Sequence, residues 1–167
     1  IQLSFMKDNI YEFGLISGGT YEKIINQVGI HYINPERGPL FRYIFCENGM
    51  IGYQNNEKFF EKKLIELYSE NEIKEIENFI TSNTIDFVEI NKINKLQKRN
   101  SMWYFSPSGV HCDDITRKKF IEKDKKENIR IKIIKLLKST LEEKFNLTIK
   151  LGGNIGLAIH PIGWDKS

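Results

Sequence analysis

The hydrophobic pattern at the start of the chain predicts a strand, a glycine turn and a helix. Glu12–Ser17 is a short, mostly apolar run typical of a buried strand, and Gly18-Gly19 follows it directly. From Thr20 onward the apolar residues recur at helical spacing up to Gly29, which stands where glycine commonly ends a helix. A strand followed in this way by a helix predicts the beginning of an α/β unit.

The next segment has the pattern of a loop followed by a hairpin. Residues 30–40 contain an Asn-Pro pair and a Gly-Pro pair, which mark a loop. Strands are predicted at Tyr43–Cys46 and Met50–Tyr53, with the turn Glu47-Asn48-Gly49 between them. Asn55-Asn56 predicts a second hairpin turn. Residues 1–60 are therefore expected to form part of a parallel α/β domain.

After about residue 60 the pattern becomes a mixture of helices and alternating strands. Ser69 and Glu72 form a capping box in front of one helix, and Asp124 and Glu127 are expected to cap a longer one. The buried side of the longer helix is predicted to carry Ile129, Ile133, Leu136, Leu137 and Leu141. The other predicted elements are a helix at Asp113–Lys123 and strands at Ile85–Ile90, Met102–Phe105, Leu147–Leu151 and Ile155–Ile159.

These elements indicate a second unit of a different class. Residues 61–160 are expected to form an α+β unit, an antiparallel sheet with helices on one face. Residues 161–167 are expected to leave that unit and return toward the first one. The domain boundaries predicted from the pattern are thus 1–60, 61–160 and 161–167.

The composition adds few constraints on function. The chain has 167 residues, of which 40% are hydrophobic and 28% charged, which is typical of a soluble globular protein. A net charge of +3 does not argue for nucleic acid, and no apolar run approaches the ~18 residues of a membrane span. Cys46 and Cys112 form no metal-type pair, so we expect reduced thiols and a cytoplasmic protein. The chain begins with Ile1, and we expect the natural start to lie upstream.

Four segments together resemble the eukaryotic-type phosphomannomutases of the haloacid dehalogenase superfamily. They are Gly-Leu-Ile-Ser-Gly-Gly-Thr-Tyr-Glu-Lys-Ile from Gly14, Phe-Cys-Glu-Asn-Gly-Met from Phe45, Asp-Lys-Lys-Glu-Asn-Ile-Arg from Asp124, and Gly-Gly-Asn-Ile from Gly152 followed by Pro-Ile-Gly-Trp-Asp-Lys from Pro161. Their order and spacing fit the family over most of the chain, whereas a single Glu-Asn-Gly would indicate nothing.

The resemblance implies an enzyme that interconverts mannose 6-phosphate and mannose 1-phosphate for GDP-mannose synthesis. It implies a haloacid dehalogenase-like α/β core, here partial, with an aspartate nucleophile and Mg²⁺. It also implies an α+β cap that grips the sugar phosphate and pairs with a second cap in a homodimer. The expected domains are then a partial core over 1–60, the cap over 61–160 and a return segment over 161–167.

The resemblance also assigns candidate binding residues. Arg99 and Arg117 match cap arginines that contact substrate phosphate, and guanidinium groups suit a dianionic phosphate because they give paired, charge-assisted hydrogen bonds. Ser17 and Gly18 match the second superfamily motif, in which a hydroxyl and backbone N–H groups bind the transferring phosphoryl group. Phosphomannomutases usually carry glycine at the position of Ser17 and serine at that of Gly19. The alternative for Ser17 is an ordinary helix N-cap.

Other positions depart from the family pattern. Its third cap arginine falls on Val110, and a serine and an aspartate that hydrogen-bond the sugar fall on Gly156 and Ala158. No Asp-x-Asp strand precedes Ser17, so we expect no catalytic residue, no Mg²⁺ ligand and no activity from residues 1–167 alone, and a natural protein longer at both ends. Two alternatives remain: a degenerate, non-catalytic relative that keeps the cap fold as a binding or dimerisation module, and a phosphatase acting on another sugar phosphate.

Several weaker candidates have ordinary explanations. The run His111-Cys112-Asp113-Asp114 suggests a metal site, but adjacent ligands rarely converge on one ion. His31 and His160 are interpreted as loop or packing residues, and Trp164 as packing at a hinge. A basic stretch with aromatic neighbours suggests a nucleic-acid patch, but the rim of a phosphate-binding cap explains the same residues: Lys92, Lys95, Lys98, Arg99, Trp103 and Tyr104.

Overall fold

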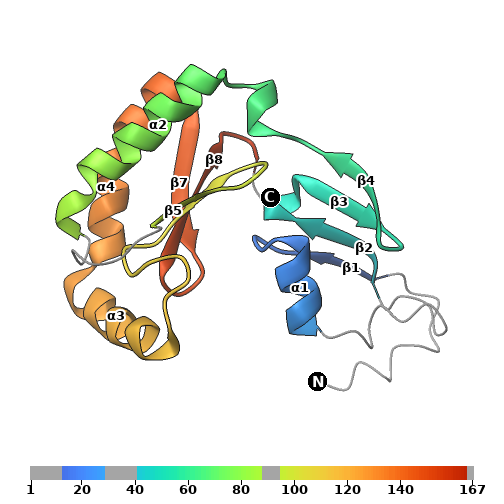
Figure 1. The fold of residues 1–167 in the computed structure, drawn as a ribbon, viewed down its shortest axis with the longest axis horizontal. Coiled ribbons are helices and arrows are strands. Elements are labelled where there is room, and N and C mark those ends of the chain that lie inside the picture. The colour runs from blue at the N-terminus through green and yellow to red at the C-terminus, as the bar shows by residue number, and fades with distance from the viewer. Residues whose placement is uncertain (1–12, 29–40, 88–94, 165–167) are drawn as a thin grey trace. The chain divides into compact units, whose positions relative to one another are not determined.

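The computed structural model describes residues 13–28, 41–87 and 95–164 of the chain (Figure 1). The described residues fall into two compact units. The first unit comprises the described part of the chain up to Lys62, together with Trp164, and the second unit is Lys63–Gly163. Each unit is built around its own sheet, so each is considered by itself.

The first unit contains a four-stranded mixed sheet with the strand order β1-β2-β3-β4. Its elements are β1 (Phe13–Ile16), α1 (Tyr21–Val28), β2 (Phe41–Cys46), β3 (Ile51–Gln54) and β4 (Glu57–Glu61). β1 pairs with β2 in parallel, as an α/β unit requires, whereas β2, β3 and β4 form an antiparallel meander. The parallel pairing expected of an α/β unit is found between β1 and β2, whereas the two predicted tight turns after β2 permit only antiparallel pairing.

Both predicted turns of this meander are confirmed. Asn55 and Asn56 have φ angles of 49° and 69°, the left-handed values that a tight hairpin turn needs and that asparagine tolerates. The turn Glu47–Gly49 between β2 and β3 is a short 3₁₀ segment in which three successive residues have positive φ. Tyr21 of α1 stacks on Tyr53 of β3 with ring centroids 4.0 Å apart, which packs the helix against the sheet.

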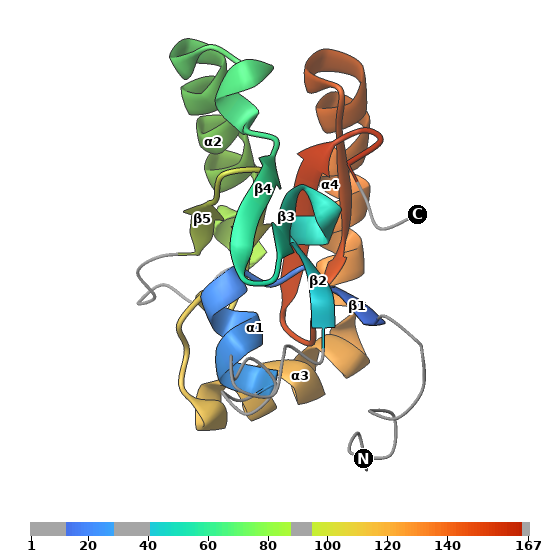
Figure 2. The same cartoon turned by 90° about the vertical axis from the view of Figure 1, so that its right-hand side faces the viewer.

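The second unit contains an antiparallel sheet with the strand order β5-β6-β8-β7. Its strands are β5 (Leu96–Lys98), β6 (Trp103–Phe105), β7 (Leu147–Gly152) and β8 (Gly156–Pro161). The helices are α2 (Glu70–Asn83), α3 (Asp114–Glu127) and α4 (Ile129–Phe145). α2 and α4 lie along one face of this sheet, and α3 packs against α4 (Figures 1 and 2). The predicted α+β architecture is confirmed.

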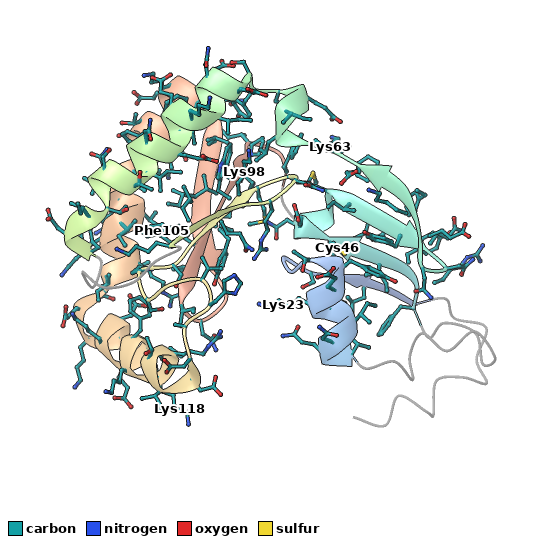
Figure 3. All side chains as sticks on the ribbon, in the orientation of Figure 1. Lys23, Cys46, Lys63, Lys98, Phe105 and Lys118 are labelled. Atoms are coloured by element: carbon teal, nitrogen blue, oxygen red, sulfur yellow. The ribbon has the colours of Figure 1, made fainter. Side chains whose placement is uncertain are left out.

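The alternation along the strands separates the two faces of this sheet. Trp103 and Phe105 of β6 pack with Leu157 and Ile159 of β8 in the core under the helices, and Phe105 is labelled there in Figure 3. Tyr104, between the two core residues of β6, therefore lies on the face that these helices do not cover. Trp103 is fully buried and donates its indole N–H to Glu77 Oε1 at 3.1 Å. It is a core residue and offers no surface to a base.

The start of α2 follows the predicted capping box. Ser69 Oγ accepts from the backbone N–H of Glu72 at 3.4 Å, and Glu72 Oε2 accepts from the N–H of Ser69 at 2.8 Å. Ser69 Oγ also donates to Glu72 Oε2 at 2.7 Å, and this hydrogen bond, together with the one from the Ser69 N–H, lowers the pKa of the Glu72 carboxyl below its usual value. The reciprocal pair satisfies backbone donors that the first helical turn leaves open.

Three details of the second unit differ from the expectations. The predicted strand at Ile85–Ile90 is instead a 3₁₀ turn over Ile85–Phe87, and the rest of it lies outside the described residues. Ile85 is 69% exposed, so the apolar alternation there does not reflect burial in a sheet. Leu136, expected to be buried, is 47% exposed. Asp124 does not occupy the N-cap position of the longer helix, because α3 continues to Glu127 and α4 begins only after Asn128.

Candidate functional site

The first candidate region is the loop Ser17–Gly19, which connects β1 to α1. Ser17 Oγ accepts from the N–H of Gly19 at 3.1 Å, so the hydroxyl sits inside the loop. The N–H of Lys23 donates to Thr20 Oγ1 at 3.4 Å, the N-cap geometry for a helix that begins at Tyr21. Ser17 is therefore not the N-cap of α1, and that alternative for its role is wrong.

The turn Glu47–Gly49 is hydrogen-bonded to this loop. The N–H of Glu47 donates to Gly19 O at 3.0 Å, and the N–H of Asn48 donates to Ser17 O at 3.0 Å. Glu47 and Asn48 have φ angles of 47° and 62°, which cost free energy in residues other than glycine. The parallel pairing of β1 with β2 explains the meeting, because the carboxyl ends of parallel strands lie at one edge of a sheet.

Cys46 lies directly before this turn and is fully buried. Burial raises the pKa of its thiol to about 12, and the neighbouring Glu47 carboxylate adds to the increase. The thiol is therefore protonated near neutral pH and is a poor nucleophile. Cys46 is a packing residue of the first unit rather than a candidate catalyst.

The second candidate region is the helix-free face of the sheet in the second unit. The strand register places Gln97, Tyr104, Ala158 and Lys150 in one row across it. Arg99 follows β5, and its Nε donates to Gln97 Oε1 at 3.1 Å. The Arg99 guanidinium carbon lies 4.9 Å from the centroid of the Tyr104 ring, a cation–π contact that covers one side of the ring.

Arg117 approaches the same tyrosine from the first turn of α3. This helix begins at Asp114 and is capped by Asp113, which accepts from the N–H of Thr116 at 2.7 Å. The Nε atom of Arg117 is buried and has no hydrogen-bond partner among the described residues. A buried N–H donor without a partner is costly, so this atom is suited to receive an anionic ligand.

Tyr104 lies in the field of three arginines. Burial raises the pKa of its phenol, and the positive charges of Arg99, Arg117 and Arg130 lower it by a smaller total amount. The phenol therefore stays protonated at neutral pH, and its O–H donates to Gly152 O at 3.3 Å. Arg99 and Arg117 were candidates from the sequence, but their arrangement around Tyr104 with Arg130 was not predicted, because the four residues come from β6, the β5–β6 turn and two helices.

Of the three positions expected to depart from the family pattern, Gly156 and Ala158 lie on this face. Gly156 lies beneath Tyr104: a Cβ atom added to it would be 2.2 Å from both Cζ and Oη of the tyrosine. Ala158 is the register partner of Tyr104 and is buried. Val110 is half-buried and lies in the turn between β6 and α3.

Arg130 and Asp124 form a buried ion pair that the sequence interpretation missed. Arg130 Nε lies 2.7 Å from Asp124 Oδ2, and Asp124 Oδ1 accepts from the backbone N–H of Arg130 at 2.8 Å. Arg130 also donates from its terminal nitrogen to Gly153 O at 2.9 Å. Asp124 therefore accepts a hydrogen bond from the first turn of α4 although it lies in α3. Arg130 in turn binds the carbonyl of Gly153 in the turn that precedes Gly156.

The weaker candidates do not gather into a site. No group of three or more His, Cys, Asp or Glu residues that could hold a metal ion occurs in the described ranges 13–28, 41–87 and 95–164. His160 is buried in β8, with Nδ1 3.1 Å from Pro161 O, whereas His31 and Lys92 lie outside the described residues. Trp164 is buried, and Nζ of Lys62 lies 5.5 Å from the centroid of the Trp164 ring. None of the helices described is long and apolar enough to cross a membrane.

Comparison with known proteins gives a consistent family. A family model described as eukaryotic phosphomannomutase matches residues 3–167. A phosphomannomutase of Dendrobium officinale is 33% identical over 171 residues, covering 99% of this chain and 64% of the relative. One from Encephalitozoon cuniculi is 33% identical and covers 92% of this chain and 58% of the relative. The chain thus spans less than two thirds of the length of these relatives.

Solved structures share the fold at low sequence identity. A protein from Streptococcus mutans superposes with a TM-score of 0.58 at 13% identity, covering 98% of this chain and 62% of that one. The C-terminal domain of the trehalose synthase regulatory protein of Candida albicans gives a TM-score of 0.54 at 15% identity, covering 95% of this chain and 47% of that one. At this identity the likeness concerns the fold alone.

Proposed function

The chain belongs to the eukaryotic phosphomannomutase family, and from this premise we propose that the protein interconverts mannose 6-phosphate and mannose 1-phosphate. In this proposal the second unit is the cap that holds the sugar phosphate, and the first unit is part of the catalytic core. The product supplies GDP-mannose synthesis in the cytoplasm, and two chains pair through their caps.

The observation that carries this proposal is the buried Nε of Arg117, which has no partner among the described residues. A phosphate oxygen would satisfy that N–H with a charge-assisted hydrogen bond. Arg99 supplies a second guanidinium next to the same tyrosine, held in place by Gln97 and by the Tyr104 ring. Two preorganised guanidinium groups suit a dianion such as a sugar phosphate.

The loop Ser17–Gly19 is proposed to bind the phosphoryl group that is transferred. Its support is the hydroxyl of Ser17, whose oxygen accepts from the N–H of Gly19 and whose own proton can donate to a phosphate oxygen, on a loop fixed by backbone hydrogen bonds from Glu47 and Asn48. Gly18 stands between them and lets the loop approach a phosphate closely. Fixed donors of this kind stabilise developing negative charge without reorganising during the reaction.

Mg²⁺ belongs to the chemistry that the family implies, since it neutralises charge on a transferring phosphoryl group. It requires several oxygen ligands, and the described residues contain no suitable cluster of acidic side chains. These residues therefore do not fit the ion, and we derive no step through it. The proposal assigns them the binding and positioning parts of the reaction.

A second candidate function is a phosphatase acting on another sugar phosphate. It is favoured by Ser17, which fits the general superfamily pattern better than the usual pattern of the mutases. Gly156 and Ala158 favour it too, because they lack the polar side chains that the mutase pattern places on the sugar.

Phosphorus NMR of the full-length protein with mannose 1-phosphate tests the proposal. A mutase converts one ester to the other and leaves total ester phosphate unchanged, a phosphatase releases inorganic phosphate, and a non-catalytic module does neither. Arg117→Ala should lower kcat/KM by about ten- to a hundredfold, the cost of hydrogen bonds to a charged group. Lys118→Ala is the matched control on the exposed side of α3 (Figure 3). Equal activity in both variants would contradict the role of Arg117.

A further inference from the structure

Tyr104 stands at the centre of the helix-free face of the second unit. Its register partners are Gln97 on β5 and Ala158 on β8, and Ala158 is in turn paired with Lys150 on β7. Both sequence neighbours of Tyr104 are core residues on the opposite face. The ring therefore belongs to the same surface as the cap arginines and not to the hydrophobic core.

The hydroxyl of Tyr104 takes the place that a side chain at position 156 would occupy. A Cβ atom on Gly156 would lie 2.2 Å from Tyr104 Oη, a distance that real Cβ atoms do not show. The φ angle of Gly156 is not in the positive range, so glycine is required there for space rather than for backbone conformation. A serine at 156 would carry its Oγ about one C–O bond from that Cβ, close to where Tyr104 Oη now lies.

The surroundings leave this hydroxyl free to accept a hydrogen bond. Its single proton goes to Gly152 O, at 3.3 Å, so the lone pairs of the phenol oxygen remain available. The contact of Arg99 is with a face of the ring, 4.9 Å from its centroid. The charge of Arg117 acts on the phenol as well, so a phosphate bound to that arginine would hold its organic part near Tyr104.

We propose that Tyr104 is a specificity-determining residue whose phenol oxygen accepts a hydrogen bond from a sugar hydroxyl of the phosphorylated ligand. It supplies from β6 the hydroxyl that the family pattern places at position 156 on β8. This inference rests on the proposed function, since it assumes a sugar phosphate on Arg99 and Arg117. Because position 158 is alanine, Tyr104 is the member of the register pair Tyr104–Ala158 that can form a hydrogen bond with the sugar.

Calorimetry of the full-length protein with mannose 6-phosphate and with inorganic phosphate tests the role of Tyr104. Tyr104→Phe keeps the ring and removes the hydroxyl. It should weaken mannose 6-phosphate binding about three- to tenfold, the loss of one neutral hydrogen bond, and leave inorganic phosphate binding unchanged. Equal mannose 6-phosphate binding by wild type and Tyr104→Phe would overturn the inference, as would equal weakening of both ligands.

Monodeoxy analogues of mannose 6-phosphate identify the hydroxyl and need only the wild type for the decisive result. One analogue should bind about three- to tenfold more weakly to the wild type, with no such loss in Tyr104→Phe. If no analogue loses affinity for the wild type, the inference is overturned even if the variant fails to fold. If the wild type binds no mannose phosphate at all, the proposed function fails first, and the two failures are thus distinguished.

Discussion

The loop Ser17–Gly19 of the first unit and the surroundings of Tyr104 in the second unit share one feature, a glycine with a hydroxyl from another residue beside it. They differ in whether a side chain could be added to that glycine without a clash. In each, a glycine stands where the resemblance leads us to expect a serine, and another hydroxyl lies beside it: Ser17 beside Gly19, and Tyr104 beside Gly156. A Cβ at Gly19 would meet Ser17 Oγ at 3.4 Å, an ordinary contact, whereas one at Gly156 would meet Tyr104 at 2.2 Å. The first glycine leaves room for a side chain, and the second does not.

The two regions also differ in the interactions that fix their conformations. The loop Ser17–Gly19 is fixed by backbone hydrogen bonds from the strained turn Glu47–Gly49. The turn before Gly156 is fixed by the side chain of Arg130, which is itself paired with Asp124. A side-chain clamp can be removed by one substitution, so the second region is the more vulnerable to mutation.

The largest expected effect is a loss of stability when the ion pair between Asp124 and Arg130 is removed. Asp124→Ala leaves the Arg130 guanidinium without its carboxylate partner, and because the Arg130 side chain is only 15% exposed, the free energy of unfolding should fall by about 3–5 kcal/mol. Urea denaturation of the full-length protein measures it. Lys125→Ala, at an exposed neighbouring position of α3, is the control. A loss below about 1 kcal/mol for Asp124→Ala would show that the pair is not a clamp.

The next effect tests the steric half of the comparison. Gly156→Ser forces Tyr104 to move and should destabilise the protein by about 1–3 kcal/mol, as overpacking does. In a Tyr104→Ala background the serine should cost much less, because the clashing atoms are gone. Thermal unfolding of the two single variants and the double variant gives the coupling. Additive losses would mean that the two side chains do not compete for space.

The titration and the reactivity of Cys46 test the packing of the turn Glu47–Gly49, which directly follows it and holds the loop Ser17–Gly19. Its pKa of about 12 lies above the value of 9.0 for a free thiol, so between these values the unfolded chain binds fewer protons than the folded chain. The contribution of Cys46 to stability is therefore complete below pH 9 and declines as the pH rises from there toward 12. In Cys112→Ala, alkylation of Cys46 at pH 8 should be much slower in the folded protein than in urea. Equal rates would show that the turn does not protect it.

The smallest effect is expected at Gly19. Gly19→Ser should change the free energy of unfolding by no more than about 0.5 kcal/mol, because a Cβ there would make only ordinary van der Waals contacts and the φ of this residue is not positive. The swap Ser17→Gly with Gly19→Ser should fold equally well. Differential scanning calorimetry checks both. A loss comparable to that of Gly156→Ser would remove the difference between the two regions.

Much of the fold followed from local patterns in the sequence. The capping box at Ser69 and Glu72 and the turn at Asn55-Asn56 are confirmed, because their hydrogen bonds and φ angles depend on residues within three positions. The strand expected at Ile85–Ile90 was wrong, because alternation does not distinguish a buried face from an exposed turn. Asp124 has the local pattern of an N-cap, but its partner Arg130 lies beyond the helix break at Asn128.

The candidate site could be predicted only in part. Arg99 and Arg117 remain predictions that rest on short motifs, and the structure adds that both charges act on Tyr104. The importance of Tyr104 depends on a register between strands about fifty residues apart, which no local pattern reveals. The same holds for the contact of Glu47 and Asn48 with the loop after β1, which follows from parallel pairing of distant strands.

The position of the ligand in a crystal structure of the full-length protein with mannose 6-phosphate tests the central claim most directly. We predict a phosphate oxygen in hydrogen-bond contact with Arg117 Nε and a sugar hydroxyl within about 3.2 Å of Tyr104 Oη. A sugar ring that lies more than about 4 Å from Tyr104 Oη, with its hydroxyls bound by other side chains, would contradict the claim.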